Sequence, residues 1–218
     1  MKHSLIILLS LPFCMQTKET LNIKSKDLIE TIYTNISGFS ITPEEEDEIR
    51  RIGGAPTYGE ITYEGAEILL NELNLTKKDI FYDLGSGVGK LIVQTYLTTP
   101  VKTAIGIELS KNRYNGALKA KEELKIKKRL NKHRNLLFKN EDILKTNFDD
   151  ATVIFMCSTC FSDECLNTLM NKMAKLKKGL KVITLRTLPE NDFFILTTKK
   201  KLPMTWSLDS SVYFYQLQ

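Results

Sequence analysis

One stretch sets the expected fold of this chain: Asp79-Ile-Phe-Tyr-Asp-Leu-Gly-Ser-Gly-Val-Gly-Lys90. Its apolar first part ends at the charged Asp83, as expected of a buried strand that runs into a turn. The three alternating glycines after this acid would let the backbone approach a ligand closely. Residues 91–97 are typical of a helix whose first N–H groups face the same ligand. The stretch therefore predicts the strand, turn and helix that begin a nucleotide-binding βαβ unit.

The acid at the head of the glycine turn indicates the kind of ligand. A dinucleotide fingerprint, G-x-G-x-x-G, approaches a pyrophosphate, which the Asp83 carboxylate would repel. The same carboxylate suits the cationic amino and sulfonium groups of S-adenosylmethionine. Glu108 ends the next predicted strand (103–108), where such folds hold ribose hydroxyls, and Asp142 ends the following one (136–142), where it could accept from the adenine amino group. The three acids together point to S-adenosylmethionine as the cofactor.

Length and element order indicate the fold class. A chain of 218 residues with 42% hydrophobic residues can bury one core. Five strands separated by helices are expected first, and then an antiparallel pair, 193–198 and 211–217, with the only tryptophan, Trp206, in the loop between them. This order predicts an α/β, Rossmann-like, seven-strand class I S-adenosylmethionine-dependent methyltransferase fold with a small helical N-terminal extension.

The amino-terminal part divides into two predicted segments. Residues 1–16 form a signal-peptide-like or apolar N-terminal segment, residues 17–56 a helical extension, and residues 57–218 the methyltransferase domain. The apolar run near the start is too short to span a membrane, which takes about 20 residues. It resembles a secretory signal, which suggests secretion. A buried N-terminal strand is the alternative, and it agrees better with a cytosolic cofactor and a cytoplasmic location.

The charge and the cysteine content limit the partners and metals that the chain is expected to bind. The formal net charge of +5 is concentrated in residues 119–134, which carry no interleaved aromatic residues. A solvated helix face is therefore favoured over nucleic-acid contact, and a monomer is expected. The four cysteines provide one C-x-x-C and no second pair, and the two histidines are remote from them in sequence. No metal site is expected, since a zinc site needs about four ligands.

Several short motifs resemble the disruptor-of-telomeric-silencing (DOT) family of non-SET lysine methyltransferases, and especially its compact bacterial relatives. The resemblance spans roughly residues 40–216 and rests on these motifs: Tyr58-Gly59-Glu60, Asp83-Leu-Gly-Ser-Gly-Val-Gly89, Gly106-Ile-Glu108, Glu141-Asp142-Ile143, Val153-Ile154-Phe155, and Trp206 with Tyr213 seven residues later. Many methyltransferases share the glycine motif alone. The Tyr-Gly-Glu triplet before it and the Trp–Tyr ending are more specific to this family.

The resemblance implies methyl transfer from S-adenosylmethionine to an accessible lysine of a protein substrate, with histone as a candidate. It implies these cofactor-binding residues: Tyr58, Glu60, Asp83, Gly85, Ser86, Gly87, Gly89, Glu108, Asp142 and Ile143. It places these residues around the transferred methyl group and the lysine channel: Tyr58, Phe155, Cys157, Ser158, Trp206 and Tyr213. No catalytic acid–base pair is needed, because displacement from a sulfonium requires a neutral amine, proximity and a dry channel.

The chain departs from the family pattern at two places. The family carries two asparagines and an aromatic residue after the fourth strand, where this chain has Cys157-Ser158-Thr159-Cys160-Phe161. Cys157 or Ser158 thus takes the place of the asparagine that orients the methyl donor in the family. Ser158 is expected to supply a side-chain oxygen near the reacting centre, with a shorter reach than asparagine. Lys90 stands where a glutamine is usual.

Other functions remain open on the sequence. Another α/β methyltransferase of the ATP-synthase c-subunit lysine type would share the glycine turn but lack the Tyr-Gly-Glu triplet. A nucleic-acid methyltransferase would fit the positive charge, although the fourth strand lacks an Asn-Pro-Pro-Tyr-type ending. A protein that binds S-adenosylmethionine without turnover would fit the missing asparagines.

Overall fold

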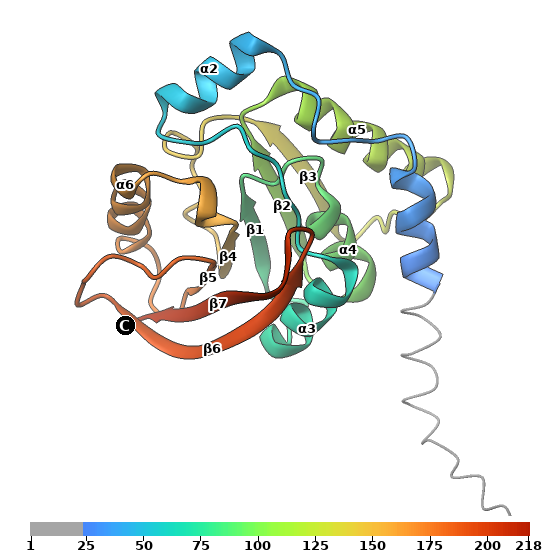
Figure 1. The fold of residues 1–218 in the computed structure, drawn as a ribbon. Coiled ribbons are helices and arrows are strands. Elements are labelled where there is room, and N and C mark those ends of the chain that lie inside the picture. The colour runs from blue at the N-terminus through green and yellow to red at the C-terminus, as the bar shows by residue number, and fades with distance from the viewer. Residues whose placement is uncertain (1–23) are drawn as a thin grey trace, which may run out of the picture.

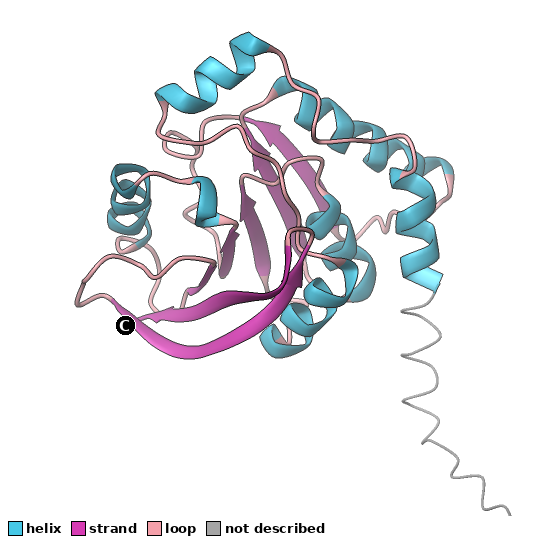
Figure 2. Cartoon of the chain, viewed as in Figure 1, coloured by secondary structure: helices cyan, strands magenta, loops and turns pink. Residues whose placement is uncertain are grey.

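A seven-strand sheet with helices on both faces forms the centre of the protein in the computed structural model, which describes residues 24–218 (Figures 1 and 2). The strands are β1 (Ile80–Leu84), β2 (Thr103–Glu108), β3 (Asn135–Asn140), β4 (Val153–Met156), β5 (Lys181–Thr184), β6 (Phe194–Met204) and β7 (Ser207–Leu217). The helices are a first helix over 24–33, α2 (Pro43–Arg51), α3 (Tyr63–Leu73), α4 (Lys90–Thr98), α5 (Lys111–Ile126), the short η1 (Ser158–Cys160) and α6 (Asp163–Met173). The predicted N-terminal segment, 1–16, lies outside the described residues.

The strand order is β3-β2-β1-β4-β5-β7-β6. Strands β1 to β5 run parallel, and β7 lies antiparallel between β5 and β6. This is the predicted order of five parallel strands and a closing antiparallel pair, so the Rossmann-like seven-strand fold is confirmed. Because β2 and β4 flank β1 on opposite sides, the order of the sheet reverses there, and open α/β sheets bind ligands at such a point.

Local capping signals explain where the helices begin. The Thr42 hydroxyl accepts from the Glu45 N–H while the Glu45 carboxylate accepts from the Thr42 N–H, which forms a capping box at the start of α2. Thr62, Ser110 and Ser162 cap α3, α5 and α6, and each side-chain oxygen accepts from a backbone N–H in the first turn of its helix.

Three strand boundaries differ from the prediction. Strand β3 ends at Asn140, so Asp142 lies in the following loop and not at the strand end. Strands β6 and β7 are longer than expected and meet at a tight turn, which converts most of the predicted loop around Trp206 into strand. The two strands pair along their full length, from Phe194–Leu217 to Met204–Ser207. Pairing with a neighbouring strand can hold residues in an extended conformation even where their composition predicts a loop, which explains the difference.

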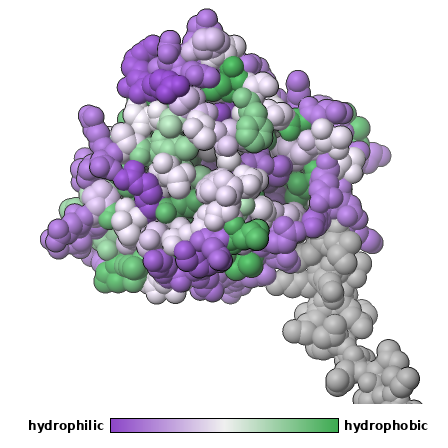
Figure 3. All heavy atoms as spheres, viewed as in Figure 1, coloured by the Kyte–Doolittle hydropathy of each residue, from purple (hydrophilic) through white to green (hydrophobic). Residues whose placement is uncertain are grey.

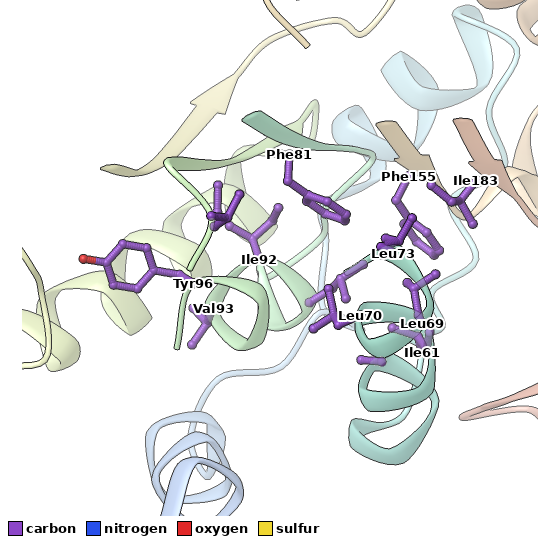
Figure 4. Close-up of a cluster of buried hydrophobic side chains, with 14 of the residues drawn as sticks. Ile61, Leu69, Leu70, Leu73, Phe81, Ile92, Val93, Tyr96, Phe155 and Ile183 are labelled. Atoms are coloured by element: carbon purple, nitrogen blue, oxygen red, sulfur yellow. The ribbon is translucent and has the colours of Figure 1, made fainter. Parts of the chain in front are cut away.

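Two hydrophobic clusters cover the two faces of the sheet. One packs α3, α4 and α5 against the sheet, and Figure 4 shows Leu69, Leu73 and Ile92 directed toward Phe81 and Phe155 within it. The other packs α6 and the 143–148 loop against the opposite face. Burial on both faces explains why the parallel strands are nearly continuous runs of hydrophobic residues.

The surface seen in Figure 3 is largely hydrophilic, with hydrophobic residues in small separate areas. In the part of the chain that the structure describes, no helix combines the length and apolarity needed to cross a membrane. The same residues contain no group of three or more Cys, His, Asp or Glu side chains arranged to hold a metal ion.

Candidate active site

Two adjoining cavities open at the carboxyl ends of the parallel strands. The larger has a volume of about 450 Å³ and the smaller about 40 Å³. They share Tyr58, Gly59, Gly85, Gly87 and Cys157, so their linings are continuous. The larger cavity falls within the range usual for sites that bind small molecules, roughly 300–1,000 Å³.

The glycine turn after β1 forms one wall of both cavities. Gly87 has φ +55°, and a Cβ atom on it would lie 2.6 Å from the Tyr58 ring. Only glycine therefore lets this turn and the Tyr58 loop approach so closely. Gly89, in contrast, lines neither cavity, and a Cβ there would meet the Phe138 ring at 2.4 Å. Glycine at this position allows the start of α4 to pack against Phe138, and the predicted contact of Gly89 with a cofactor remains a prediction.

Asp83, the last residue but one of β1, lines the smaller cavity and is only 4% exposed. Its Oδ1 atom has no hydrogen-bond partner among the residues that the structure describes, and neither does the buried Oγ of Ser86 beside it. Burial, and then the nearby Glu108 carboxylate, raise the pKa of Asp83 to about 8. An unpartnered buried carboxylate is costly to a folded protein, so this one is best explained by a cationic ligand.

Glu108 ends β2 and lines the larger cavity. Its carboxylate accepts from the N–H groups of Gly87 and Ser110, both at 2.8 Å. Burial raises the pKa of Glu108, while these two N–H groups and the Arg113 guanidinium act in the opposite direction. The carboxylate therefore joins the glycine turn to the start of α5 and faces the cavity beside it.

The loop before α3 contributes to the walls of both cavities. The Tyr58 hydroxyl donates to Glu60 Oε1 at 2.5 Å and accepts from the Val88 N–H at 3.4 Å. Lys90, the first residue of α4, forms an ion pair with the other oxygen of Glu60. These contacts attach the Tyr-Gly-Glu triplet to the glycine turn.

Arg113 binds the loop that carries Tyr58. Its Nε donates to the Gly38 carbonyl at 2.9 Å and its Nη2 to the Pro56 carbonyl at 2.7 Å. The guanidinium also lies 4.8 Å from the centre of the Tyr58 ring. The sequence interpretation did not select Arg113, because the basic run that it considered covers residues 119–134 and Arg113 lies before it. Its position five residues after Glu108, in the first turn of α5, was the available signal.

The segment after β4 lines the larger cavity, but not through the residue expected. Cys157, Thr159, Cys160 and Phe161 face the cavity. Ser158 is fully buried; its Oγ bonds to Thr184 Oγ1 and accepts from the Arg186 N–H at 3.0 Å. The prediction that Ser158 places an oxygen in the pocket is therefore wrong, because the turn of η1 directs this side chain toward β5.

Cys157 lines both cavities, and burial raises the pKa of its thiol to about 12. The thiol is consequently neutral near pH 7 and serves as a small wall residue rather than a nucleophile. Phe161, which the sequence interpretation did not select, lies near Gly85: a Cβ on that glycine would be 3.7 Å from its ring. Its aromatic character after the C-x-x-C was the available signal.

The other aromatic residues that the sequence predicts for the site lie at different places in the structure. Trp206 lines the larger cavity and covers Gly59, where a Cβ atom would lie 2.4 Å from the indole ring. Phe155 lines the smaller cavity beside Asp83. Tyr213 lines neither: it pairs with Thr184 across the sheet, and its ring lies 5.0 Å from the Lys199 ammonium group. The structure does not support Tyr213 as a wall of these cavities.

The two predicted adenine-binding residues also differ in position. Ile143 lines the larger cavity, whereas Asp142 lines neither. Asp142 Oδ1 accepts from the Leu144 N–H at 2.8 Å, and Oδ2 lies 3.5 Å from Lys145 Nζ. In this structure Asp142 shapes the loop that presents Ile143, and its predicted contact with adenine remains a prediction.

The sheet order and the buried acid at the end of β1 define a class I methyltransferase fold. Solved structures agree at the level of the fold. An RNA methyltransferase from Salinibacter ruber in complex with S-adenosyl-L-homocysteine matches 70% of this chain and 89% of its own, with a TM-score of 0.51 and 20% identity. The mitomycin 7-O-methyltransferase matches 71% of this chain and 53% of its own, with a TM-score of 0.50 and 11% identity.

Within that class, residues 44–213 match the family described as histone methylation protein DOT1, and the chain belongs to this family. A histone-lysine N-methyltransferase specific for H3 lysine-79 from Caenorhabditis elegans is 32% identical over 62% of this chain and 15% of its own length. The Drosophila melanogaster enzyme of that name is 28% identical over 58% of this chain and 7% of its own. A protein-lysine N-methyltransferase from Saccharolobus islandicus is 29% identical over 53% of this chain and 67% of its own. The chain therefore spans only a small part of the two animal relatives.

Proposed function

We propose that this chain is an S-adenosylmethionine-dependent methyltransferase that acts on the side-chain amine of a lysine in a protein. The observation that carries the proposal is the unpartnered carboxylate of Asp83 in a cavity at the switch point of the sheet. Family membership and the relatives named as lysine methyltransferases support the same activity.

The residues present fit S-adenosylmethionine. Asp83 Oδ1 and Ser86 Oγ are buried polar atoms without a hydrogen-bond partner among the described residues, and the amino-acid end of the cofactor would supply one. Glu108 faces the larger cavity with a carboxylate suited to ribose hydroxyls, and Ile143 offers apolar surface to the adenine ring. When bound, S-adenosylmethionine supplies a methyl group on a sulfonium.

The lysine would enter between the aromatic residues Trp206 and Phe161. An ammonium group loses its proton before it can attack carbon, and an apolar passage lowers its pKa by desolvation. The aromatic faces can hold the cationic methylated product through cation–π contact. The lysine proton can pass to water before the amine enters the passage. No titratable group that lines the two cavities is therefore needed to accept this proton. Positioning and exclusion of water would therefore be the main contributions of the protein.

Acidic residues on the helix beside the larger cavity favour a basic protein as the substrate. Helix α2, whose residue Ile49 lines the larger cavity, carries the exposed Glu44, Asp47 and Glu48. A basic protein such as a histone would meet favourable charge there. The basic run, 119–134, lies instead on α5 and the loop after it, and we propose no nucleic-acid substrate for it.

The direct test is incubation of the purified protein with S-adenosylmethionine labelled in its methyl group. Core histones, nucleosomes, total cell protein and transfer RNA would be offered separately. Label on a lysine of a protein, located by mass spectrometry, is the expected result. Label in RNA would overturn the substrate class. Normal binding of the cofactor without transfer to any of the four would replace the enzyme with a binding protein.

Glu108→Ala is expected to weaken binding of S-adenosylmethionine by about 10- to 100-fold, as typical for loss of hydrogen bonds to a charged group. It also leaves the buried N–H groups of Gly87 and Ser110 without an acceptor, so the melting temperature should fall. Glu108→Gln keeps one acceptor and should lose less of both. Calorimetry and thermal unfolding measure the two effects, and unchanged affinity in Glu108→Ala would contradict the assignment.

Ser158→Ala is expected to destabilise the protein by about 1–3 kcal/mol, because the partly buried Arg186 N–H and the buried Thr184 hydroxyl lose their partner. Affinity for the cofactor should stay within about twofold of the wild type, since Ser158 faces neither cavity. Urea unfolding and calorimetry provide the two measurements. Thr159→Ala is the matched comparison, because that neighbour does line the larger cavity. If Ser158→Ala bound the cofactor more weakly at unchanged stability, Ser158 would after all contribute to the cofactor pocket.

A further inference from the structure

Three of the four cysteines of this chain line the larger cavity: Cys157, Cys160 and Cys165. The first two are partly exposed, whereas Cys165 is only 2% exposed and packs in the hydrophobic cluster that joins α6 to the sheet. The proposed methyl transfer needs no thiol. Cys157 and Cys160 have the C-x-x-C spacing of dithiols that convert reversibly to a disulfide. This pair therefore carries chemistry that the proposed function leaves unassigned.

The η1 turn brings these two thiols close together. Cys157 is the N-cap of η1 and Cys160 is its last residue, and both are free thiols in this structure. Side chains three residues apart eclipse each other in a 3-10 helix, and the rise between them is about 6 Å. Cα atoms joined by a disulfide lie roughly 4.4–6.8 Å apart, so this spacing permits the bond. Thr159 Oγ1 lies 3.8 Å from Cys157 Sγ and 4.0 Å from Cys160 Sγ, so both sulfurs approach the same atom.

Cys160 also contacts the loop that leads to the Tyr-Gly-Glu triplet. Its thiol donates a weak hydrogen bond to the Thr57 carbonyl at 3.7 Å, and its own carbonyl accepts from the Ala55 N–H at 2.8 Å. A sulfur that turns toward Cys157 must leave the Thr57 carbonyl, whereas the backbone bond can remain. Because Cys157 lines both cavities and Thr57 lines the larger one, a sulfur–sulfur bond would change the wall that a ligand contacts.

We propose that Cys157 and Cys160 form a reversible disulfide by exchange with a low-molecular-weight disulfide such as oxidised glutathione, and that this bond weakens ligand binding in the cavities. The Cys160 thiolate attacks one sulfur of the glutathione disulfide and releases one glutathione thiolate. The Cys157 thiolate then attacks Cys160 Sγ in the mixed disulfide and releases the second glutathione thiolate. The protons of the two protein thiols pass to the two glutathiones. The protein loses two electrons, which reduce the glutathione disulfide.

The surroundings of Cys157 favour a bond that persists once it has formed. Burial raises the pKa of the Cys157 thiol to about 12, so its thiolate is not stabilised in the reduced protein. Disulfides that are strong oxidants depend on a stabilised reduced form, which the Cys157 thiol does not provide. The same high pKa makes the second exchange step slow, because only the thiolate attacks. The exchange must therefore be followed until it reaches equilibrium.

The first test asks whether this bond forms, and it does not depend on the proposed function. The reduced full-length chain would be incubated with glutathione mixtures of increasing oxidised fraction, and its unreduced peptides sequenced by mass spectrometry. A bond between Cys157 and Cys160 that dithiothreitol reverses is expected. Cys157→Ser should stop at a mixed disulfide of Cys160 with glutathione, and Cys165→Ser should still form the bond. Absence of the bond in every mixture, or a bond from Cys160 to Cys165 or Cys14 in its place, would overturn the inference.

The second test concerns the ligand and rests on the proposed function. S-adenosylhomocysteine would be titrated calorimetrically into the reduced and the oxidised wild type. The oxidised form should bind at least about fivefold more weakly, the lower end of typical coupling between sites. Since coupling is reciprocal, saturating ligand should demand a correspondingly more oxidising glutathione mixture for half-formation of the bond. Cys160→Ser is the matched control, because it cannot form the bond and should bind equally before and after the same treatment.

The outcomes separate this inference from the proposed function. Equal affinity of the oxidised and reduced wild type for S-adenosylhomocysteine would overturn the inference and leave the proposed function intact. An equal loss of affinity in treated Cys160→Ser would also overturn it, because the loss would then come from another thiol. Failure of the reduced wild type to bind S-adenosylhomocysteine would overturn the proposed function, whereas the mapped disulfide would stand.

Discussion

Replacing Asp83 with alanine is expected to reduce affinity for S-adenosylmethionine by about 10- to 100-fold, as typical for removal of a charged hydrogen-bond partner. The carboxylate is buried and has an unpartnered oxygen in the described structure, so a cationic ligand would be its main compensation. Calorimetric titration measures the loss. Asp209→Ala, an exposed acid on the β6–β7 hairpin, is the control and should bind normally. Unchanged affinity in Asp83→Ala would defeat the cofactor assignment.

The raised pKa of Asp83 adds a pH dependence with a definite sign. With a pKa of about 8, the carboxyl group of the free protein is mostly protonated at pH 7, and a cationic ligand favours its ionised form. Binding should therefore release protons, and affinity should increase as the pH rises from 6 to 8. Titrations in buffers with different ionisation enthalpies measure the released protons. Asp83→Asn should abolish this release.

The same shift has the opposite effect on the stability of the free protein. The folded pKa lies above the unfolded value of about 3.9. The folded state thus holds the proton more tightly, and the free energy of unfolding falls as the pH rises from about 4 through 8. Asp83→Asn removes this dependence, so it should stabilise the free protein more at pH 8 than at pH 5. Thermal unfolding at both pH values tests this, and an equal change at both would contradict the shift.

Trp206→Ala is expected to reduce methyl transfer by about 100-fold or more, a loss typical of a displaced reactant, while affinity for S-adenosylmethionine stays within about threefold. The indole lines the larger cavity and covers Gly59, so its removal opens the proposed lysine passage to water. Asp83 and Glu108 lie at strand ends and should remain in place. Single-turnover transfer and calorimetry give the two values.

Two further variants at the hairpin make this prediction specific. Trp206→Phe should recover part of the transfer rate, because it restores an aromatic face. Leu208→Ala lies on the same hairpin, and the Leu208 side chain is 81% exposed, so this variant should behave as the wild type. A Trp206→Ala protein that transfers normally, or that loses cofactor affinity in proportion to its rate, would contradict a role confined to the lysine passage.

Local signals in the sequence were enough for most of the fold. The apolar run ending at Asp83, the alternating glycines and the caps at Thr42, Ser110 and Ser162 each act over a few residues. Interactions of that range are present in the chain wherever it folds, so they mark strand ends and helix starts reliably. The parallel order of the sheet followed from the alternation of strands and helices. Asp83 and Glu108 could be assigned to the site because parallel strands end at one edge of the sheet.

Only the tertiary structure decided which way side chains face beyond the strand ends. Ser158 and Thr159 are neighbours of similar chemistry, yet η1 directs one toward Thr184 and the other into the cavity. Tyr213 belongs to the predicted Trp–Tyr pair, but its pairing opposite Thr184 keeps it from the cavities that Trp206 reaches. Lys90 meets Glu60 across thirty positions of sequence. Such contacts depend on how distant segments pack. A shift of one residue in a turn would point each side chain to the other side, so no local pattern in the chain specifies these contacts.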